Sequence, residues 1–264
     1  MNQKQKNLMF VSALATLFVV LAASVFAANV PIGAEKLTHI KTETLNTSQI
    51  SVSNWWAYAG NVTQMDLYGL SVTKHWQGFF GDITGTIVLD DAQNWTMYDW
   101  PNLEPKGEVY AVNTSTTPTW SNVECFNFTD LNGATGNLTD VENSYNITFN
   151  DVDGIDETYN MTTHPDFSIG TDHSIDANTC PSTYTHINDL WQDDKFVQLL
   201  LQDGERPIFM TIIENDDEGN NTGVGGFDTV DHDFQLLVPE DGTSWDTGEI
   251  NRNPTRYWFY LDLE

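Results

Sequence analysis

The chain has 264 residues, of which 40% are hydrophobic, and it contains 9 Trp, 9 Tyr and 14 Phe. This is enough apolar material for one large β domain or two small domains, and it excludes wholesale disorder. The formal net charge is −28, from 10 Lys and Arg against 38 Asp and Glu. A surface this negative repels nucleic acids and anionic lipids, because both require basic side chains to replace their counterions.

The first segment has the layout of a secretory signal peptide. Lys4 and Lys6 form a short positive region, and residues 7–28 then carry no charge. Val25-Phe26-Ala27 places small residues at positions −3 and −1 of a cleavage site. We therefore predict that residues 1–28 are a signal peptide. An uncleaved signal anchor is the alternative, since about 20 apolar residues span a bilayer.

The signal peptide and the signal anchor both place the rest of the chain outside the cytoplasm, because the lysines stay on the cytoplasmic side. A pilin-type leader, kept to build a filament, is a third alternative. It fits less well, because Asn7 follows Lys6 where a small residue would mark that cleavage. No second apolar run of this length occurs, so contact with a membrane is predicted only through the N-terminal segment.

The residues after the leader have the composition and spacing that are typical of a β protein. Residues 29–53 are polar and rich in Thr and Ser, which predicts a linker or an edge strand. From residue 54 onward, short runs of β-forming residues alternate with Gly, Asn and Asp, and turns are predicted at Asp90-Asp91 and Pro101-Asn102. The predicted strands are residues 72–77, 83–89, 107–112, 207–213, 233–239 and 257–264, while residues 188–202 suit a short helix or a strand.

These runs predict an antiparallel β-sandwich over residues 54–264, preceded by a hydrophobic signal or anchor helix. Residues 130–190 are rich in Asp, Asn, Thr and Gly, and we expect them to be a loop-rich insertion. Cys125 and Cys180 nearly bracket this stretch. Two cysteines in one exported domain usually form a disulfide, which would tie the insertion at its base.

Two stretches resemble a known group of proteins. The first is WQGFFGDITGTIVLD at residues 76–90, and the second is DFQLLVPE at 233–240 together with YWFYLDL at 257–263. They resemble a group of uncharacterised secreted archaeal proteins that are associated with the cell surface. The resemblance covers residues 54–126 and 207–264 and brings no catalytic residues. It implies an archaeal extracellular or cell-surface setting.

Sites for N-linked sugar are unusually dense. Asn-x-Ser/Thr sequons are the acceptors for this modification, and export makes the transfer possible. Used sequons must lie on the surface, and a thick glycan coat favours a structural role over an enzyme with an open cleft. Nine sequons follow the leader, at Asn46, Asn61, Asn94, Asn113, Asn127, Asn137, Asn146, Asn160 and Asn220.

The best candidate for a metal site is the stretch DVDGIDE, in which Asp151, Asp153, Asp156 and Glu157 surround a glycine. Calcium prefers several oxygen ligands on a loop that wraps the ion, and alternate acidic residues with a glycine supply them. The order differs from that of an EF-hand loop, and an acidic turn that simply faces water is the alternative interpretation. Ca²⁺ is the only cofactor that the sequence predicts.

The other groups of candidate site residues give weaker indications of function. His164, His173 and His186 lie among acidic residues, but their spacing matches no defined zinc site. There is no nucleophile elbow, no HExxH motif and no phosphate-binding glycine loop. Tryptophans that would stack on sugars, or else pack in the core, are Trp55, Trp56, Trp76, Trp95 and Trp100.

The sequence thus favours an exported, acidic, glycosylated structural or filament-forming protein of the cell surface without catalytic activity, stabilised by calcium and by the Cys125–Cys180 bridge. Its expected partners are copies of itself or other surface proteins, through strand edges. A secreted carbohydrate-binding module is the first alternative, for which the aromatic count is the motive. A secreted hydrolase is the second, motivated only by location and by the abundance of carboxylates.

Overall fold

The computed structural model describes residues 30–41, 59, 62, 64, 75–90, 95–102, 106–128, 138–148, 151–171, 173–187, 190–191, 195–214, 224–228, 230–241 and 254–263. The predicted signal segment, residues 1–28, lies outside these ranges. So do five of the predicted sequon asparagines, Asn46, Asn61, Asn94, Asn137 and Asn220. No helix within the described ranges is long and apolar enough to cross a membrane.

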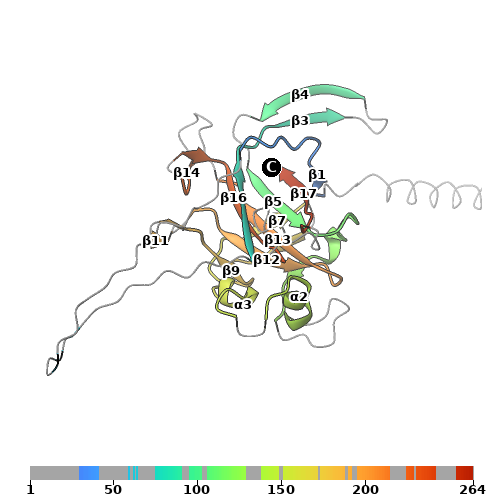
Figure 1. Cartoon of the computed structure of the whole chain (residues 1–264). Coiled ribbons are helices and arrows are strands. Elements are labelled where there is room, and N and C mark those ends of the chain that lie inside the picture. The colour runs from blue at the N-terminus through green and yellow to red at the C-terminus, as the bar shows by residue number, and fades with distance from the viewer. Residues whose placement is uncertain are drawn as a thin grey trace, which may run out of the picture.

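The described chain is mainly β, and all of its strand pairs are antiparallel, which confirms the predicted class at this level (Figure 1). Two short α-helices and one 3-10 turn accompany the strands. The elements are β1 (Ile32–Gly33), β2 (Trp76–Gly81), β3 (Gly85–Asp90), β4 (Thr96–Asn102), β5 (Gly107–Val112), η1 (Trp120–Asn122), β6 (Glu124–Cys125), α2 (Leu138–Ser144), α3 (Ile155–Thr158), β7 (Phe167–Ile169), β8 (His173–Ile175), β9 (Ser182–Thr183), β10 (His186–Ile187), β11 (Leu190–Trp191), β12 (Gln198–Gln202), β13 (Pro207–Ile212), β14 (Val224–Gly225), β15 (Asp231–His232), β16 (Phe234–Pro239) and β17 (Trp258–Leu263).

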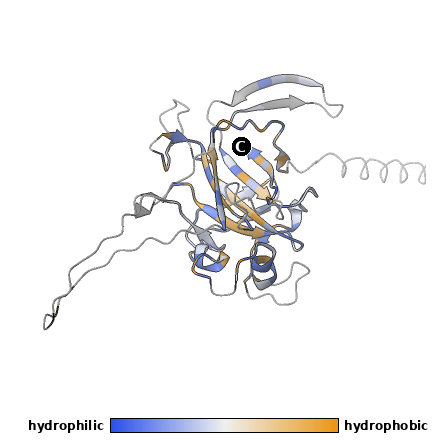
Figure 2. Cartoon of the chain, viewed as in Figure 1, coloured by the Kyte–Doolittle hydropathy of each residue, from blue (hydrophilic) through white to orange (hydrophobic). Residues whose placement is uncertain are grey.

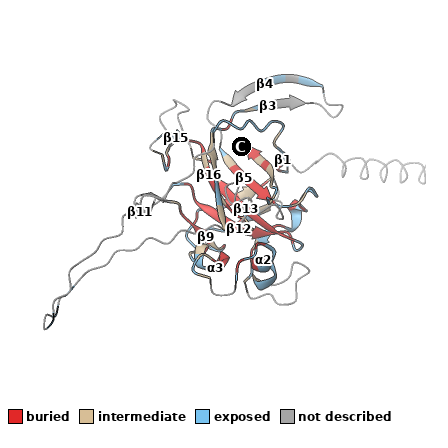
Figure 3. Ribbon diagram, in the orientation of Figure 1, coloured by how far each residue is buried: buried red, intermediate tan, exposed pale blue. Residues whose placement is uncertain are grey.

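A seven-stranded sheet forms the centre of the molecule. Its strands follow the order β1-β17-β5-β13-β12-β6, and β9 also pairs with β12. The inner strands β5, β12 and β13 are buried almost throughout, because both faces of the sheet are covered (Figure 3). A strand buried on both faces carries mostly apolar residues, and much of the central sheet is orange in Figure 2.

Alternate residues of the central strands enter two separate cores, as the period of two in a strand requires. On β5, Tyr110 and Val112 belong to the first core, while Val109 and Ala111 belong to the second. The first core is completed by residues of η1, β7 and β8 and by Cys180. The second core is completed by residues of α2, α3, β2 and β16.

The pair β2–β16 covers the second core, and it joins two distant parts of the sequence. Its register places Trp76 opposite Pro239 and Gly81 opposite Phe234. These strands contain parts of the two stretches on which the family resemblance rests. The paired parts of the resembling segments, Trp76–Gly81 and Phe234–Pro239, are therefore direct neighbours in space, although they are far apart along the chain.

Gln198 of β12 connects β16 to the central sheet. Its side chain is fully buried, and its Nε2 donates to the Gln235 carbonyl oxygen at 2.9 Å while its Oε1 accepts from the Leu237 N–H at 2.6 Å. These are backbone groups of β16 that face away from β2. The glutamine thus satisfies them as a neighbouring strand would, which avoids the cost of burying unpaired backbone groups.

The observed strands agree with most of the predicted ones. Residues 107–112 form β5 as predicted, and 207–213, 233–239 and 257–264 match β13, β16 and β17 to within one residue at each end. The first predicted strand, residues 72–77, is displaced, since β2 begins only at Trp76. Residues 198–202 of the ambiguous segment 188–202 are strand β12.

The turn predicted at Pro101-Asn102 is wrong. Both residues belong to β4, where Pro101 lies opposite Thr86 of β3. The pair β3–β4 is a two-stranded sheet, so each of its strands keeps one outer edge. Proline is tolerated at such an edge because its missing N–H removes no ladder hydrogen bond there.

The described part of residues 130–190 is built into the body of the molecule. Val141 and Tyr145 at α2 and Ile155 and Tyr159 at α3 are buried in the second core. Phe167 of β7 is buried in the first core. The two helices were not predicted from sequence, because helices of seven and four residues have little intrinsic stability and depend on such packing.

Short strands cap both outer edges of the central sheet. β1 pairs with Tyr260 and Leu261 of β17 on one side. On the other side, β6 and β9 pair with opposite ends of β12. Each cap is only two residues long, and short edge strands limit uncontrolled pairing between molecules.

Candidate functional site

Three carboxylates meet where the end of α2 lies beside the start of α3. One oxygen from each of Glu142, Asp156 and Glu157 lies within 4.8 Å of the others. Glu142 is buried, with 2% of its surface exposed, whereas Asp156 is half-buried and Glu157 is exposed. Among the described residues, none of the ion pairs involves these three acids. The acids therefore face one another without a basic side chain of the described chain to balance them.

Gly154 leaves the space that these oxygens occupy. A Cβ added to Gly154 would lie 2.8 Å from Glu142 Oε1 and 3.2 Å from the Asp151 carbonyl oxygen, and closer still to Glu157 Oε2. Glu142 Oε1 also accepts the N–H of Ile155 at 3.0 Å, which holds its carboxylate over the start of α3. Two carboxylate oxygens and one carbonyl oxygen thus converge on one small volume, and these are ligand types that calcium prefers.

The electrostatics of the cluster disfavour three separate charges. Burial raises the pKa of Glu142, and the charges of Asp156 and Asp151 raise it further. A hydrogen bond with the Asp156 side chain raises the pKa of Glu157. Two carboxylates in hydrogen-bonding contact must share a proton, or else a cation must lie between them, because like charges at this distance repel.

The predicted metal ligands divide into two pairs. Asp156 and Glu157 belong to the cluster, whereas the carboxylates of Asp151 and Asp153 do not. The Asp151 carboxylate accepts from Thr148 Oγ1 at 3.0 Å, and the Asp153 carbonyl oxygen accepts from Trp76 Nε1 at 2.7 Å. Neither of these two carboxylates is among the three that meet.

Glu142 is the member of the cluster that sequence reasoning missed. It lies nine residues before Asp151 and belongs to a helix that carried no clear sequence signal. Its one distinguishing feature is that it is a buried glutamate beside the buried Val141. Only the packing of α2 against α3 brings it to the acidic loop.

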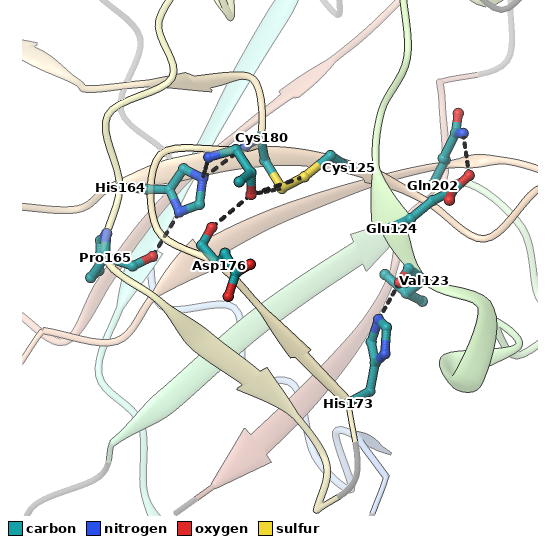
Figure 4. The surroundings of a disulfide bond; sticks show 10 residues. Val123, Glu124, Cys125, His164, Pro165, His173, Asp176, Cys180 and Gln202 are labelled. Atoms are coloured by element: carbon teal, nitrogen blue, oxygen red, sulfur yellow. Dashed lines mark hydrogen bonds between the residues drawn. A yellow bond between two sulfur atoms is a disulfide. The ribbon is translucent and has the colours of Figure 1, made fainter.

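The predicted disulfide between Cys125 and Cys180 is present. Cys125 belongs to β6, and Cys180 lies just before β9, so the bond joins the two short strands that cap the β12 edge. Cys180 is fully buried in the first core. Figure 4 shows the bond together with its hydrogen-bonded surroundings.

The histidines near the disulfide have structural partners. His164 Nε2 accepts the N–H groups of Thr179 and Cys180, at 3.0 and 2.8 Å, and its Nδ1 contacts the Pro165 carbonyl oxygen at 2.7 Å (Figure 4). Nδ1 is therefore the protonated nitrogen of a neutral ring. His173 Nε2 contacts the Val123 carbonyl oxygen at 2.5 Å. Both rings are engaged with backbone groups, which gives no support to the zinc hypothesis.

Four of the nine sequon asparagines are described, and all four are exposed. Asn113 follows β5, Asn127 follows β6, Asn146 follows α2 and Asn160 follows α3. Their side-chain amides therefore lie at the surface, although Asn113 Nδ2 also donates to the Tyr145 hydroxyl at 2.8 Å. The sequons that the structure describes meet the basic requirement for modification, which is access from solvent.

The candidate sugar-stacking tryptophans differ in their surroundings. Trp76 is half-buried and its ring lies 6.1 Å from that of Tyr159, so it is a packing residue. Trp95 is 72% exposed, just before β4. Trp55 and Trp56 lie outside the described residues, as does the side chain of Trp100.

Neither a protein-family model, nor a curated protein, nor a solved structure matches this chain. The function is therefore argued from the residues and their geometry.

Proposed function

We propose that this chain is an exported, glycosylated structural protein of the cell surface, with no catalytic role. The observation that carries the proposal is that every described sequon asparagine is exposed, on a domain whose two cysteines are joined. Both properties suit a protein that matures in an oxidising compartment where sugar is transferred. We class its layered sheets as an antiparallel β-sandwich preceded by a signal or anchor segment.

The strong acidity supports the same setting. With 38 acidic and 10 basic residues, the surface is suited to a medium rich in salt or metal ions. We propose that neighbouring copies associate through the outer edge of β17. In the described chain, β1 pairs with Tyr260 and Leu261 of this six-residue strand, and the Ala34 N–H donates to the Phe259 carbonyl oxygen at 3.0 Å. Addition of a strand from another molecule would use the remaining edge.

The test is a peptide map of the protein recovered from its own host. We expect the N-terminus of the mature chain to begin after the leader or to retain it as an anchor, and the Asn127 and Asn146 peptides to carry sugar. Unmodified asparagine at every sequon would contradict the proposal. Mass spectrometry reads the leader and the sequons in the same digest.

We further propose that Glu142, Asp156 and Glu157 bind Ca²⁺ as part of this structural role. A ligand that binds only the folded state stabilises it by about 2.7 kcal/mol at 100 times its Kd. We therefore expect a higher melting temperature in calcium than in chelator. The double substitution Glu142→Gln and Glu157→Gln should abolish this difference, while Asp153→Asn, in the same loop but outside the cluster, should preserve it. If the unaltered protein melts at the same temperature in calcium and in chelator, the proposed calcium site is wrong.

The pH dependence without calcium has a defined sign. The pKa values of Glu142 and Glu157 are raised in the folded state, so folding favours their protonated forms. Their contribution to stability is full below the unfolded value near 4.5 and declines as the pH rises through the folded pKa. In chelator, the melting temperature should therefore fall as the pH rises above about 4.5, by more than it does in the Gln double variant. Calcium should suppress this fall, because it replaces the protons.

A carbohydrate-binding module is the second candidate. It is favoured by the exposure of Trp95, which lies just before β4, and of Tyr98, which belongs to β4. Aromatic rings at 72% and 55% exposure offer surfaces on which a sugar stacks. Titration with soluble polysaccharides, followed by tryptophan fluorescence, tests this function. A saturable fluorescence change that disappears in Trp95→Ala would support carbohydrate binding, and an unchanged spectrum would contradict it.

A further inference from the structure

A cavity of about 590 Å³ opens beside the β2–β16 pair. Five separate segments line it: the two strands, the residues around the end of α3, the end of β9 with the residues after it, and the turn that follows β14. The volume lies in the range of sites that hold small organic ligands. The lining residues that matter here are Gly78, Phe80, Asn160, Tyr184, Phe227 and Leu237.

The cavity presents aromatic surface to solvent. The rings of Phe80 and Phe227 pack edge to face, with centroids 4.7 Å apart. Phe227 is still 39% exposed, and Phe80 is half-buried. Gly78, two residues before Phe80 on the same face of β2, carries no side chain. Lys41 Nζ lies 5.5 Å from the centroid of the Phe80 ring, and the centroid of the His232 ring lies 4.9 Å from it. Aromatic side chains that line a cavity of this size are typical of sites for small ligands.

Polar groups interleave with the aromatic ones. Thr158, Thr183 and Gln235 line the same cavity. The Gln235 amide donates to Thr185 Oγ1 at 3.1 Å and accepts from the Phe227 N–H at 3.0 Å. Glu157 is the one charged residue among the lining residues. Aromatic faces combined with hydroxyl and amide groups suit an uncharged, amphipathic ligand such as a sugar, which has apolar C–H faces and polar edges.

Asn160 is both a lining residue and a sequon asparagine. Its Nδ2 donates to the Glu157 carbonyl oxygen at 2.8 Å, which uses one of its two amide hydrogens and fixes the direction of the other. Attachment replaces that other N–H by an N–C bond to the anomeric carbon of a glycosyl phosphate donor. The phosphate leaves and the proton goes to solvent, so the hydrogen bond to Glu157 is kept.

We propose that the N-linked glycan on Asn160 packs its first sugars into this cavity, over Phe80 and Phe227. The inference rests on the proposed glycosylation of the chain. Asn113, Asn127 and Asn146, the other described sequon asparagines, are not among the cavity residues. Sugars at those positions extend into solvent, whereas the sugar on Asn160 is part of the folded structure.

The experiment compares sequon variants of the full chain, secreted from its own host. Thr162→Ala destroys the Asn160 sequon but keeps the asparagine and its hydrogen bond, and Thr162→Ser is the matched control that preserves the sequon. Asn127→Gln removes a sequon remote from the cavity. Mass spectrometry gives occupancy at Asn160, and thermal unfolding with hydrogen exchange of residues 78–80 gives the structural effect.

Thr162→Ala is expected to lower Tm by about 2–4 °C and to speed exchange at residues 78–80, while the two control variants leave both unchanged. In a Phe80→Ala background, the Tm difference between Thr162→Ala and Thr162→Ser should disappear.

An occupied Asn160 with no difference between the Thr162 variants would overturn the inference. Sugar at other sequons but none at Asn160 would overturn it too, yet leave the proposed function standing. If no sequon carries sugar, this inference and the proposed function are both contradicted. A bound free sugar in the cavity of Thr162→Ala that restores Tm would support the predicted chemistry of the cavity.

Discussion

Replacement of both Cys125 and Cys180 by alanine is expected to lower the free energy of unfolding by about 4 kcal/mol. The bond links residues that are 55 positions apart, and closing a loop of this size restricts the unfolded chain by about that amount. It also joins β6 to the segment before β9, so its loss releases both strands that cover the outer edge of β12. Urea unfolding followed by circular dichroism gives the change.

The oxidised and reduced forms of the unaltered protein supply the control. Reduction should cause a loss similar to that of the alanine pair, because both break the same covalent link. A serine pair should cost more than the alanine pair, since Cys180 is fully buried and a serine hydroxyl there would need a partner. An alanine pair that unfolds at the same urea concentration as the unaltered protein would show that the bond contributes nothing to stability.

Substitution of Gln198 by alanine should cost a comparable amount, about 4 kcal/mol. The change leaves the Gln235 carbonyl and the Leu237 N–H without their side-chain partner. Each buried group that loses its hydrogen bond costs about 1–3 kcal/mol, and the truncated side chain adds a small cavity. The β2–β16 pair should loosen first, which hydrogen exchange of residues 234–239 will detect.

Gln202→Ala is the matched control on the same strand. The Gln202 amide donates to Glu124 Oε1, a side chain of an exposed residue that water hydrates once the glutamine is gone. Its loss should therefore cost no more than about 1–2 kcal/mol. Equal losses in the two variants would refute the view that Gln198 stands in for a strand beside β16.

Strands were predictable where a local run of β-forming residues is sufficient to indicate them. Residues 107–112 form β5 because a run of β-forming residues suits a strand that is buried on both faces. The disulfide was also predictable from sequence, because a chain with two cysteines allows a single intramolecular bond. The order of strands in the sheet, by contrast, depends on contacts between distant segments that no local pattern encodes.

The candidate sites show the same limit. The acidic loop at residues 151–157 was visible in sequence, yet Glu142 joins it only because α2 packs against α3. Asp151 and Asp153 share the expected composition, but their carboxylates are not among the three that meet. The cavity beside Asn160 combines five segments, and only the folded chain brings its aromatic residues to a sequon.

The central claim is that the folded domain lies outside the cytoplasm in a mature, modified form. The most direct measurement is the mass, before and after reduction, of the chain recovered separately from cytosol, envelope and medium. We predict that the protein is found in the envelope or medium, heavier than its polypeptide by attached sugar, and that reduction adds two hydrogens at Cys125 and Cys180. A cytosolic chain of bare polypeptide mass with both thiols already free would contradict the account.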